Sequence, residues 1–134
     1  MSIGILLVTH PGIGQMLLQN ACKLLGNCPL RIRCLDIPLD DDPEQLLKKA
    51  REAACVLDDG SGILILTDAF GATPSNIACE LTREIQANVV SGLNLPMLIR
   101  VFNYSSDDLA TLTHKAAEGG MRGIQVSRAS GEAS

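Results

Sequence analysis

The sequence predicts an α/β domain in which a mostly parallel central sheet is covered by helices on both faces. Short apolar runs alternate with longer amphipathic segments, and the connections between them are short. The runs at residues 3–8 and 63–66 are almost purely apolar, which is typical of strands buried on both faces. Strands that alternate with helices imply right-handed crossovers, and we expect a doubly wound, three-layer arrangement with the strand order 2-1-3-4.

The first half of the chain predicts two strands, each followed by a helix. Residues 3–9 form the first strand, and the next helix runs to about Leu25 with Gly26 as its stop. Residues 31–37 form the second strand. Asp42-Pro43 then marks a helix start with an acidic N-cap and a proline at the first helical position. The side chains expected to be buried are Leu17, Ala21, Leu24 and Leu25 in the first helix and Leu46, Ala50, Ala53 and Leu57 in the second.

The second half repeats the alternation with shorter elements. Residues 62–67 form the third strand, and Thr73-Pro74 begins a helix that runs to about Ile85. Ser105 or Ser106 caps a later helix that ends at Gly119-Gly120. The other elements expected here are a strand at residues 87–91, a short helix at 96–103 and a last short strand at 122–126.

Composition excludes several classes of protein. A chain of 134 residues is the usual size of one domain, and a net charge of −4 argues against a nucleic-acid partner. The N-terminus lacks the pattern of a signal peptide, and no apolar run approaches the roughly 20 residues that span a bilayer, so we expect a cytoplasmic location. The five cysteines include no C-x-x-C pair. We therefore expect reduced, buried thiols and no metal site.

Two strand ends carry complementary chemistry. The first strand leads into His10-Pro11, and the third leads into Asp68. In an open parallel sheet, ligands bind outside the carboxyl ends of the strands where the winding reverses, and the first and third strands are neighbours there. We expect the Asp68 carboxylate to accept the Nδ1 proton of His10 and to leave Nε2 as the nucleophile. This pairing indicates a histidine that accepts a phosphoryl group.

The residues after Asp68 predict an anion site at a helix start. They supply small side chains, two hydroxyl groups and backbone N–H groups, which favour phosphate, and they are Gly71, Ala72, Thr73, Ser75 and Asn76. Taken alone, Thr73 also fits an ordinary N-cap, and Asp68 also fits a loop aspartate that bonds its own backbone. No G-K-[ST] sequence follows the glycines, which argues against a nucleoside triphosphatase.

Three further residues attract attention less strongly. His114 lies in a predicted helix, and we interpret it as a surface or interface residue. Phe70, one of few aromatic residues, either anchors a partner or packs its loop onto the core. Cys79 has no histidine near it in sequence, and we interpret it as a core residue.

Three segments resemble the IIA component of the mannose-type bacterial phosphotransferase system (PTS). They are GILLVTH at residues 4–10, DAFGATPSN at 68–76 and SGLNLPML at 91–98. The resemblance covers residues 1–126, which we take as the domain, and leaves a short polar tail at 127–134. It implies a doubly wound α/β domain that is usually a homodimer. Residues 122–126 would then form an antiparallel edge strand exchanged between subunits.

The resemblance also implies a function. Phospho-HPr would donate a phosphoryl group to His10, Asp68 would orient the ring, and the loop from Gly71 to Asn76 would line the site. A IIB component would then accept the group during sugar uptake. The scheme needs no cofactor and no metal, and the protein would meet the membrane only indirectly, through IIC and IID components.

Two departures from the family keep other functions open. Pro11 stands where the family usually has glycine, and we expect it either to stiffen the site or to alter docking of HPr without abolishing phosphorylation. The chain also stops where many members continue into a fused IIB domain. The alternatives are a regulatory sensor of phosphorylation state in a system without transport, and a phosphate donor subunit for a dihydroxyacetone kinase. From another class, a flavodoxin-like small-molecule binder is disfavoured because few aromatic residues are available to stack on a flavin.

Overall fold

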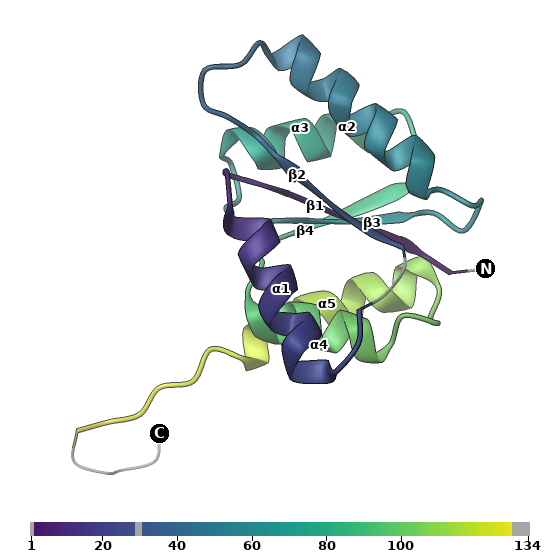
Figure 1. Cartoon of the computed structure of the whole chain (residues 1–134). Helices are drawn as coiled ribbons and strands as arrows, with labels where there is room; N and C mark the ends of the chain where they lie inside the picture. The colour runs from purple at the N-terminus through teal and green to yellow at the C-terminus, as the bar shows by residue number, and fades with distance from the viewer. Residues whose placement is uncertain (1, 29–30, 130–134) are drawn as a thin grey trace.

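Four parallel strands form a central sheet between two layers of helices in the computed structural model, which describes residues 2–28 and 31–129 (Figure 1). The strands are β1 (Gly4–Thr9), β2 (Ile32–Asp36), β3 (Ile63–Thr67) and β4 (Ala87–Ser91). Their order is β2-β1-β3-β4, and all three neighbouring pairs are parallel. The predicted fold class and strand order are confirmed. Among the described residues no helix combines the length and the apolar character that a membrane crossing requires.

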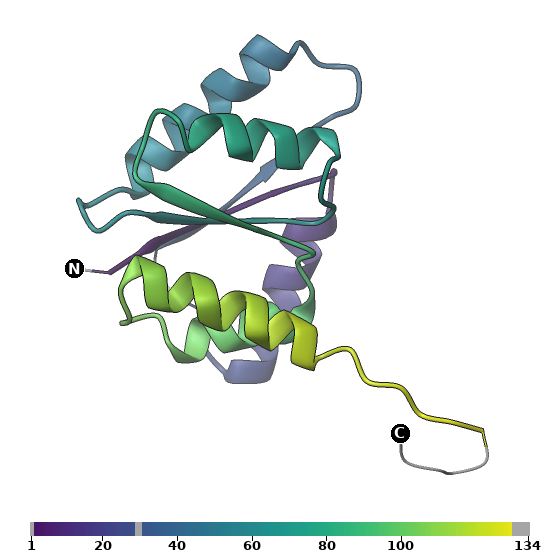
Figure 2. The same ribbon diagram turned by 180° about the vertical axis from the view of Figure 1, so that it is seen from behind.

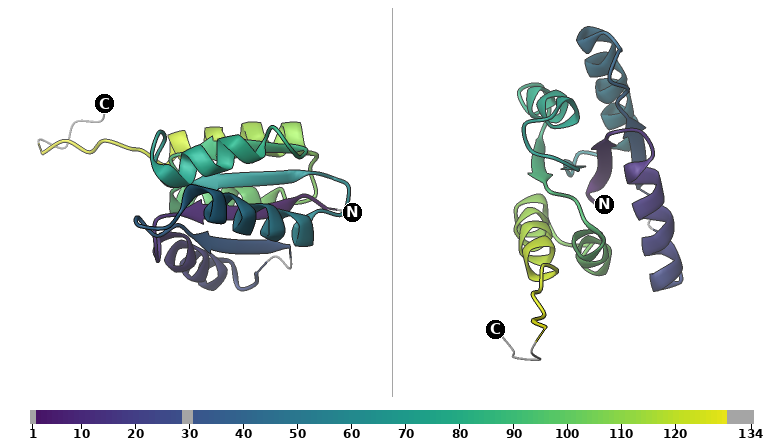
Figure 3. Two further views of the ribbon diagram at one scale, coloured as in Figure 1. Left: turned by 90° about the horizontal axis from the view of Figure 1, so that it is seen from above. Right: turned by 90° about the vertical axis from the view of Figure 1, so that its left-hand side faces the viewer.

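The helices divide between the two faces of the sheet. One face carries α1 (Ile13–Leu25), α4 (Leu95–Asn103) and α5 (Leu109–Arg122), and the other carries α2 (Pro43–Leu57) and α3 (Thr73–Leu81) (Figures 1 and 3). Alternate side chains of β1 supply the two cores: Ile5 and Leu7 pack beneath α1 and α4, whereas Leu6 and Val8 pack beneath α2 and α3. Burial on both faces explains why β1 and β3 are apolar.

The winding of the chain reverses between β1 and β3. The helix after β1 lies on one face of the sheet, and the helix after β3 lies on the other (Figure 3). The loop after β1 and the loop after β3 therefore run to opposite faces of the sheet from the carboxyl ends of these adjacent strands. Open α/β sheets bind ligands at this place. His10 follows β1 directly, and Asp68 follows β3 directly.

The helix α5 differs from its prediction at both ends. Its N-cap is Asp108 rather than Ser105 or Ser106, and the Asp108 carboxylate accepts the Thr111 N–H at 2.8 Å. The helix also continues through Gly119 and Gly120 to Arg122. A Cβ at Gly119 would lie 2.6 Å from the Arg100 Cβ. The glycines therefore permit close packing of α5 on α4 and do not end the helix.

Two further elements differ from their predictions, one in length and one in its presence. The helix α3 ends at Leu81 rather than near Ile85, because the following amides turn back to carbonyls three residues earlier, as in Glu84 N–H to Leu81 O. The predicted strand at residues 122–126 is absent from the described chain, since Arg122 ends α5. The segment after it is exposed and leads away from the domain (Figure 2). The predicted tail at 127–134 falls partly outside the described residues.

Several predictions of burial were wrong. Leu24 is 64% exposed, and Cys55 and Cys79 are exposed rather than in the core. Their helices place these side chains on the faces that point away from the sheet. Cys22 and Cys28 form a disulfide with a Cα–Cα distance of 4.9 Å, where we expected reduced thiols. The left-handed turn at Gly26 reverses the chain after α1 and brings the two cysteines together.

Candidate functional site

His10 and Asp68 meet above the carboxyl ends of β1 and β3. The Nδ1 atom of His10 lies 2.7 Å from Oδ2 of Asp68, and the same oxygen accepts the backbone N–H of His10 at 3.1 Å. The other carboxylate oxygen accepts the N–H of Ala69 at 3.1 Å. One aspartate thus holds both the ring and the backbone of His10, with the Nδ1 proton on the side of the carboxylate. This arrangement leaves Nε2 as the ring nitrogen with a free lone pair.

Burial and hydrogen bonding act in opposite directions on Asp68. Partial burial disfavours its charged form, but the hydrogen bonds from the His10 ring and the His10 backbone outweigh this effect and lower the pKa of the carboxyl below its usual range. The side chain of Asp68 is 9% exposed, whereas that of His10 is 31% exposed. The pair therefore presents an anchored carboxylate beneath a histidine that solvent and other molecules can reach.

The amino end of α3 follows Asp68 after a loop of four residues, 69–72. Its N-cap is Ala72, which offers no side chain to the helix, whereas the sequence favoured Thr73 as the cap. Within the described residues, the N–H groups of Thr73 and Ser75 have no hydrogen-bond partner, and Pro74 has no N–H. The Thr73 side chain is exposed. Free amides at a helix start favour a bound anion.

The loop residues expected to bind phosphate occupy different places. The Ser75 side chain is 1% exposed, and its Oγ lies 3.4 Å from Oγ of Ser91, below the surface of the site. The Asn76 amide donates to the Gly71 carbonyl at 3.4 Å and so closes the loop. Thr73 alone carries an exposed hydroxyl in this segment, and Ser75 faces the site through its backbone.

Sequence reasoning missed a layer of buried hydroxyl groups under the site. Thr9 and Thr67 are the last residues of β1 and β3, and each is at most 1% exposed. The Thr67 hydroxyl donates to Ser91 Oγ at 2.9 Å, which links β3 to β4. The sequence does contain one signal for these hydroxyl groups, because a threonine directly precedes both His10 and Asp68.

Several exposed apolar side chains lie on the segments that follow β1 and β3. Phe70 is 85% exposed, so it does not pack its loop onto the core, and Pro11 is also exposed. Met16 is 58% exposed on the first turns of α1. A hollow of about 390 Å³ begins two residues after His10 and is lined by Gly12, Ile13, Met16, Leu17, Asn20 and Leu95. The segments that carry His10 and Asp68 thus also carry exposed apolar side chains.

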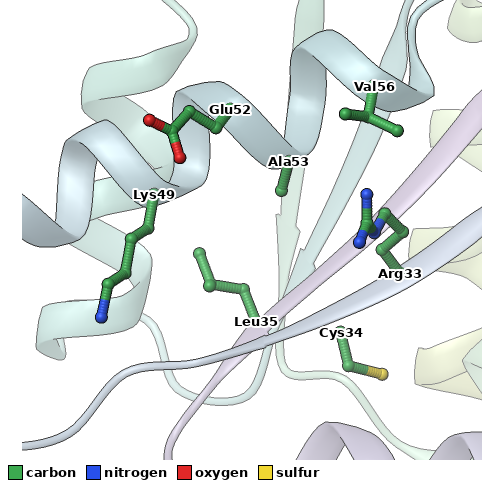
Figure 4. A pocket seen from close by; sticks show the side chains of 7 residues that line it. All are labelled: Arg33, Cys34, Leu35, Lys49, Glu52, Ala53 and Val56. Atoms are coloured by element: carbon green, nitrogen blue, oxygen red, sulfur yellow. The ribbon is translucent and has the colours of Figure 1, made fainter.

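A second hollow, of about 370 Å³, lies at the other edge of the sheet between β2 and α2 (Figure 4). It is lined by Arg33, Cys34, Leu35, Lys49, Glu52, Ala53 and Val56. Neither His10 nor Asp68 nor the loop after Asp68 contributes to it. Burial raises the pKa of the Cys34 thiol to about 11, with a further contribution from Asp36, so this cysteine is a poor nucleophile. We assign no chemistry to this hollow.

The remaining candidates lie apart from the site. His114 is on α5 with a side chain that is 79% exposed, and its nearest acid is Glu118 at 3.7 Å. Cys79 lies on the exposed face of α3. Among the residues that the structure describes, no group of three or more His, Cys, Asp and Glu side chains is arranged to hold a metal ion.

Fold and site together define a doubly wound α/β domain with a carboxylate-held histidine at its switch point. The family of PTS system fructose IIA components matches residues 4–117. The PTS system mannose-specific EIIAB component of Escherichia coli (strain K12) is 30% identical over 132 residues, which are 96% of this chain and 41% of that protein. The chain therefore belongs to the PTS IIA family, and it spans about two fifths of the length of these curated relatives.

Solved structures show the same fold. The mannose/sorbose-specific IIA subunit from Enterococcus faecalis superposes with a TM-score of 0.85 at 19% identity, over 96% of both chains. The EIIA component from Streptococcus agalactiae gives a TM-score of 0.82 at 23% identity, over 92% of this chain and 96% of that one. At these identities the likeness concerns the fold.

Proposed function

We propose that this protein carries a phosphoryl group on Nε2 of His10 in a sugar phosphotransferase system. Phospho-HPr donates the group, and a IIB component accepts it. The observation that carries the proposal is the 2.7 Å contact between His10 Nδ1 and Asp68 Oδ2, beside the uncapped amino end of α3. Membership in the PTS IIA family supports the same role.

The transfer exchanges one nitrogen–phosphorus bond for another. The Nε2 lone pair of His10 attacks the phosphorus of the donor's phosphohistidine, and the donor's N–P bond breaks with its electron pair returning to the donor imidazole. The Nδ1 proton of His10 stays on the side of Asp68, whose carboxylate stabilises the positive charge that forms on the ring. Since the bond formed resembles the bond broken, the step is readily reversible.

The amino end of α3 stabilises the moving phosphoryl group. Its equatorial oxygens carry negative charge, and fixed donors aimed at them lower the barrier. We assign this role to the exposed Thr73 hydroxyl and to the backbone N–H groups of Gly71, Thr73 and Ser75. Asn76 contributes by holding the Gly71 carbonyl, and Ala72 by leaving the helix end without a side-chain cap.

The apolar surface around His10 receives the donor protein. Phe70 and Pro11 flank the histidine, and Ile13 and Met16 extend the surface along α1. Exposed apolar residues beside a reactive group are suited to a protein partner that must bring its own phosphohistidine within bonding distance.

We further propose a homodimer in which residues 124–126, the part of the predicted strand at 122–126 that follows α5, pair with β4 of the partner subunit. Ile124 and Val126 alternate with Gln125 and are 72% and 63% exposed, and β4 pairs only with β3 among the described strands. Light scattering at micromolar concentration should give twice the chain mass. Replacing both apolar residues with glutamate, Ile124→Glu and Val126→Glu, should give monomers. A monomeric wild type would refute the pairing.

The test of the phosphocarrier role uses both histidines. The protein is mixed with phosphoenolpyruvate, enzyme I and HPr, and its intact mass is followed. We expect the wild type and His114→Ala to gain one acid-labile phosphoryl group, and His10→Ala to gain none. A phosphorylated His10→Ala, or an unmodified wild type beside active carriers, would refute the proposal. Adding IIB or a dihydroxyacetone kinase to the phosphorylated protein then identifies the acceptor.

A further inference from the structure

The side chain of Thr9 is hydrogen-bonded to the backbone of His10. Its hydroxyl donates to the His10 carbonyl at 2.8 Å and accepts the Gly14 N–H at 3.0 Å. We propose that Thr9 is a positioning residue, whose hydroxyl sets the orientation of the His10 ring by fixing the peptide that carries it. The inference rests on the proposed function, because it assigns to Thr9 a part in the phosphoryl transfer at His10.

Thr9 is buried, so its hydroxyl forms hydrogen bonds with protein atoms rather than with solvent. The residue is 1% exposed, and a buried hydroxyl is costly unless it is hydrogen-bonded. Its backbone is already engaged in the sheet, since the Thr9 carbonyl accepts the Ile37 N–H at 2.9 Å. Among the described residues, the Thr9 hydroxyl makes no hydrogen bond within the sheet. Both of its hydrogen bonds go to residues that follow the strand, His10 and Gly14.

That segment begins α1 without an ordinary cap. The N-cap residue, Gly12, has no side chain, and the Thr9 hydroxyl supplies the missing acceptor to Gly14 from three residues upstream of the cap. A Cβ at Gly14 would lie 3.2 Å from Thr9 Oγ1, so the first turn of α1 rests directly on the hydroxyl. Thr9 thereby fixes His10 relative to both β1 and α1.

The two ends of the His10 backbone are held by different groups. Its N–H donates to Asp68, and its carbonyl accepts from Thr9 and, at 3.3 Å, from the Ile13 N–H. Since Asp68 Oδ2 accepts from both the backbone N–H and the ring of His10, a shift of the His10 backbone disturbs both contacts at once. Loss of the Thr9 bond therefore weakens the control of the ring by Asp68.

The expected effect is on the rate of transfer rather than on binding of the donor. A catalytic group that is misplaced by about 1 Å can lose on the order of 100-fold in rate. The Ile13 N–H and Asp68 still restrain His10 after the hydroxyl is removed, so we expect a loss of roughly 10-fold. Thr9 is buried and does not touch a docked partner, so KM for phospho-HPr should stay within about 2-fold.

Two variants at Thr9 separate the hydroxyl from the shape of the side chain. Thr9→Val keeps the shape and removes both hydrogen bonds, whereas Thr9→Ser keeps the hydroxyl and removes a methyl group. Thr113→Val is the matched control, because Thr113 Oγ1 also joins two hydrogen bonds, to Leu109 O and from Asn88, but lies on α5 away from His10. Circular dichroism and thermal unfolding establish that each variant is folded.

The experiment measures kcat and KM for transfer from phospho-HPr, together with the nitrogen NMR shifts of the His10 ring in the unphosphorylated protein. We expect kcat to fall in Thr9→Val, to be close to wild type in Thr9→Ser and to be unchanged in Thr113→Val. The Nδ1 and Nε2 shifts should move toward those of a mixed tautomer in Thr9→Val alone. A folded Thr9→Val with wild-type kcat and wild-type ring shifts would overturn the proposal, as would equal losses in Thr9→Val and Thr9→Ser.

The ring shifts keep this test distinct from that of the phosphocarrier role. If the wild type accepts no phosphoryl group, the phosphocarrier role fails, and the positioning of His10 by Thr9 is decided by the shifts alone. If the wild type is phosphorylated and the shifts are identical in all variants, the phosphocarrier role stands and the positioning role fails.

Discussion

The carboxyl ends of β1 and β3 are built alike but direct their threonines differently. Thr9 turns its hydroxyl toward the helix that follows its own strand, where it accepts an amide of α1. Thr67, in the same position on β3, turns its hydroxyl to Ser91 on the neighbouring strand. The start of α1 is consequently capped, whereas the start of α3 is left with free amides.

This difference assigns separate chemistry to the two strand ends. The β1 end holds a histidine in place and supplies acceptors to the Ile13 and Gly14 amides of α1. The β3 end supplies the carboxylate that holds the histidine and an open helix start that favours an anion. Under the proposed function, a phosphoryl group on His10 would be attracted to the β3 side, and variants on either side should fail in different ways.

The largest effect should follow the loss of charge at Asp68. Asp68→Asn keeps the shape, but its amide can present a donor to Nδ1 and thereby favour the wrong tautomer. We expect transfer to His10 to slow on the order of 100- to 10,000-fold, as when the carboxylate of a Ser-His-Asp triad is replaced. Rapid-quench measurement of transfer from phospho-HPr gives the rate.

Asp36→Asn is the control for Asp68→Asn. Asp36 ends β2 at the same edge of the sheet, in register with Thr9, and makes no contact with His10 among the described hydrogen bonds. Its variant should transfer at the wild-type rate. A wild-type rate in Asp68→Asn would show that the carboxylate has no part in the mechanism. The contact between His10 and Asp68 would then have no role in the transfer.

The sequence was sufficient to predict the sheet, because its two central strands, β1 and β3, are apolar runs that are buried along their whole length. Continuous apolar runs, a helix after each strand and the switch-point rule also placed His10 beside Asp68. The dipeptide Gly119-Gly120 was misjudged as a helix stop because its packing partners, Arg100 and Met97, lie on another helix. Local sequence carries no signal for such a contact.

The finer parts of the site depended on tertiary contacts as well. Ser75 looked like a phosphate ligand because it follows Thr73-Pro74, but the turn into α3 directs its side chain to Ser91. Thr9 drew no interest because a threonine at the end of a strand is ordinary. Its importance comes from Gly14, which approaches closely enough to bond the hydroxyl.

A smaller effect should follow truncation of the aromatic side chain beside the site. Phe70→Ala removes an exposed ring from the β3 side without touching the His10–Asp68 contact. We expect KM for phospho-HPr to rise roughly 5- to 10-fold, which corresponds to an interface contribution of about 1 kcal/mol, while kcat stays near wild type. Steady-state phosphorylation at varied phospho-HPr concentration separates the two constants.

Val56→Ala is the control for Phe70→Ala, because Val56 is 67% exposed on α2, away from the histidine. Its KM should be unchanged. If both variants leave KM unchanged, the donor does not use the Phe70 side of the site. A fall in kcat for Phe70→Ala would instead show that the ring acts on the reacting groups.

The smallest effect concerns stability in acid. The hydrogen bonds from His10 outweigh burial and lower the pKa of Asp68 in the folded protein, so its contribution to stability is complete above the unfolded-state value of about 3.9. As the pH falls below that value and through the lower folded-state pKa, protonation removes the contribution. Urea unfolding between pH 7 and pH 3 should therefore show a steeper acid loss of stability in wild type than in Asp68→Asn, which cannot titrate. Equal slopes would mean that the contact between the two strand ends adds no net stability, and that Asp68 is kept for orienting His10 alone.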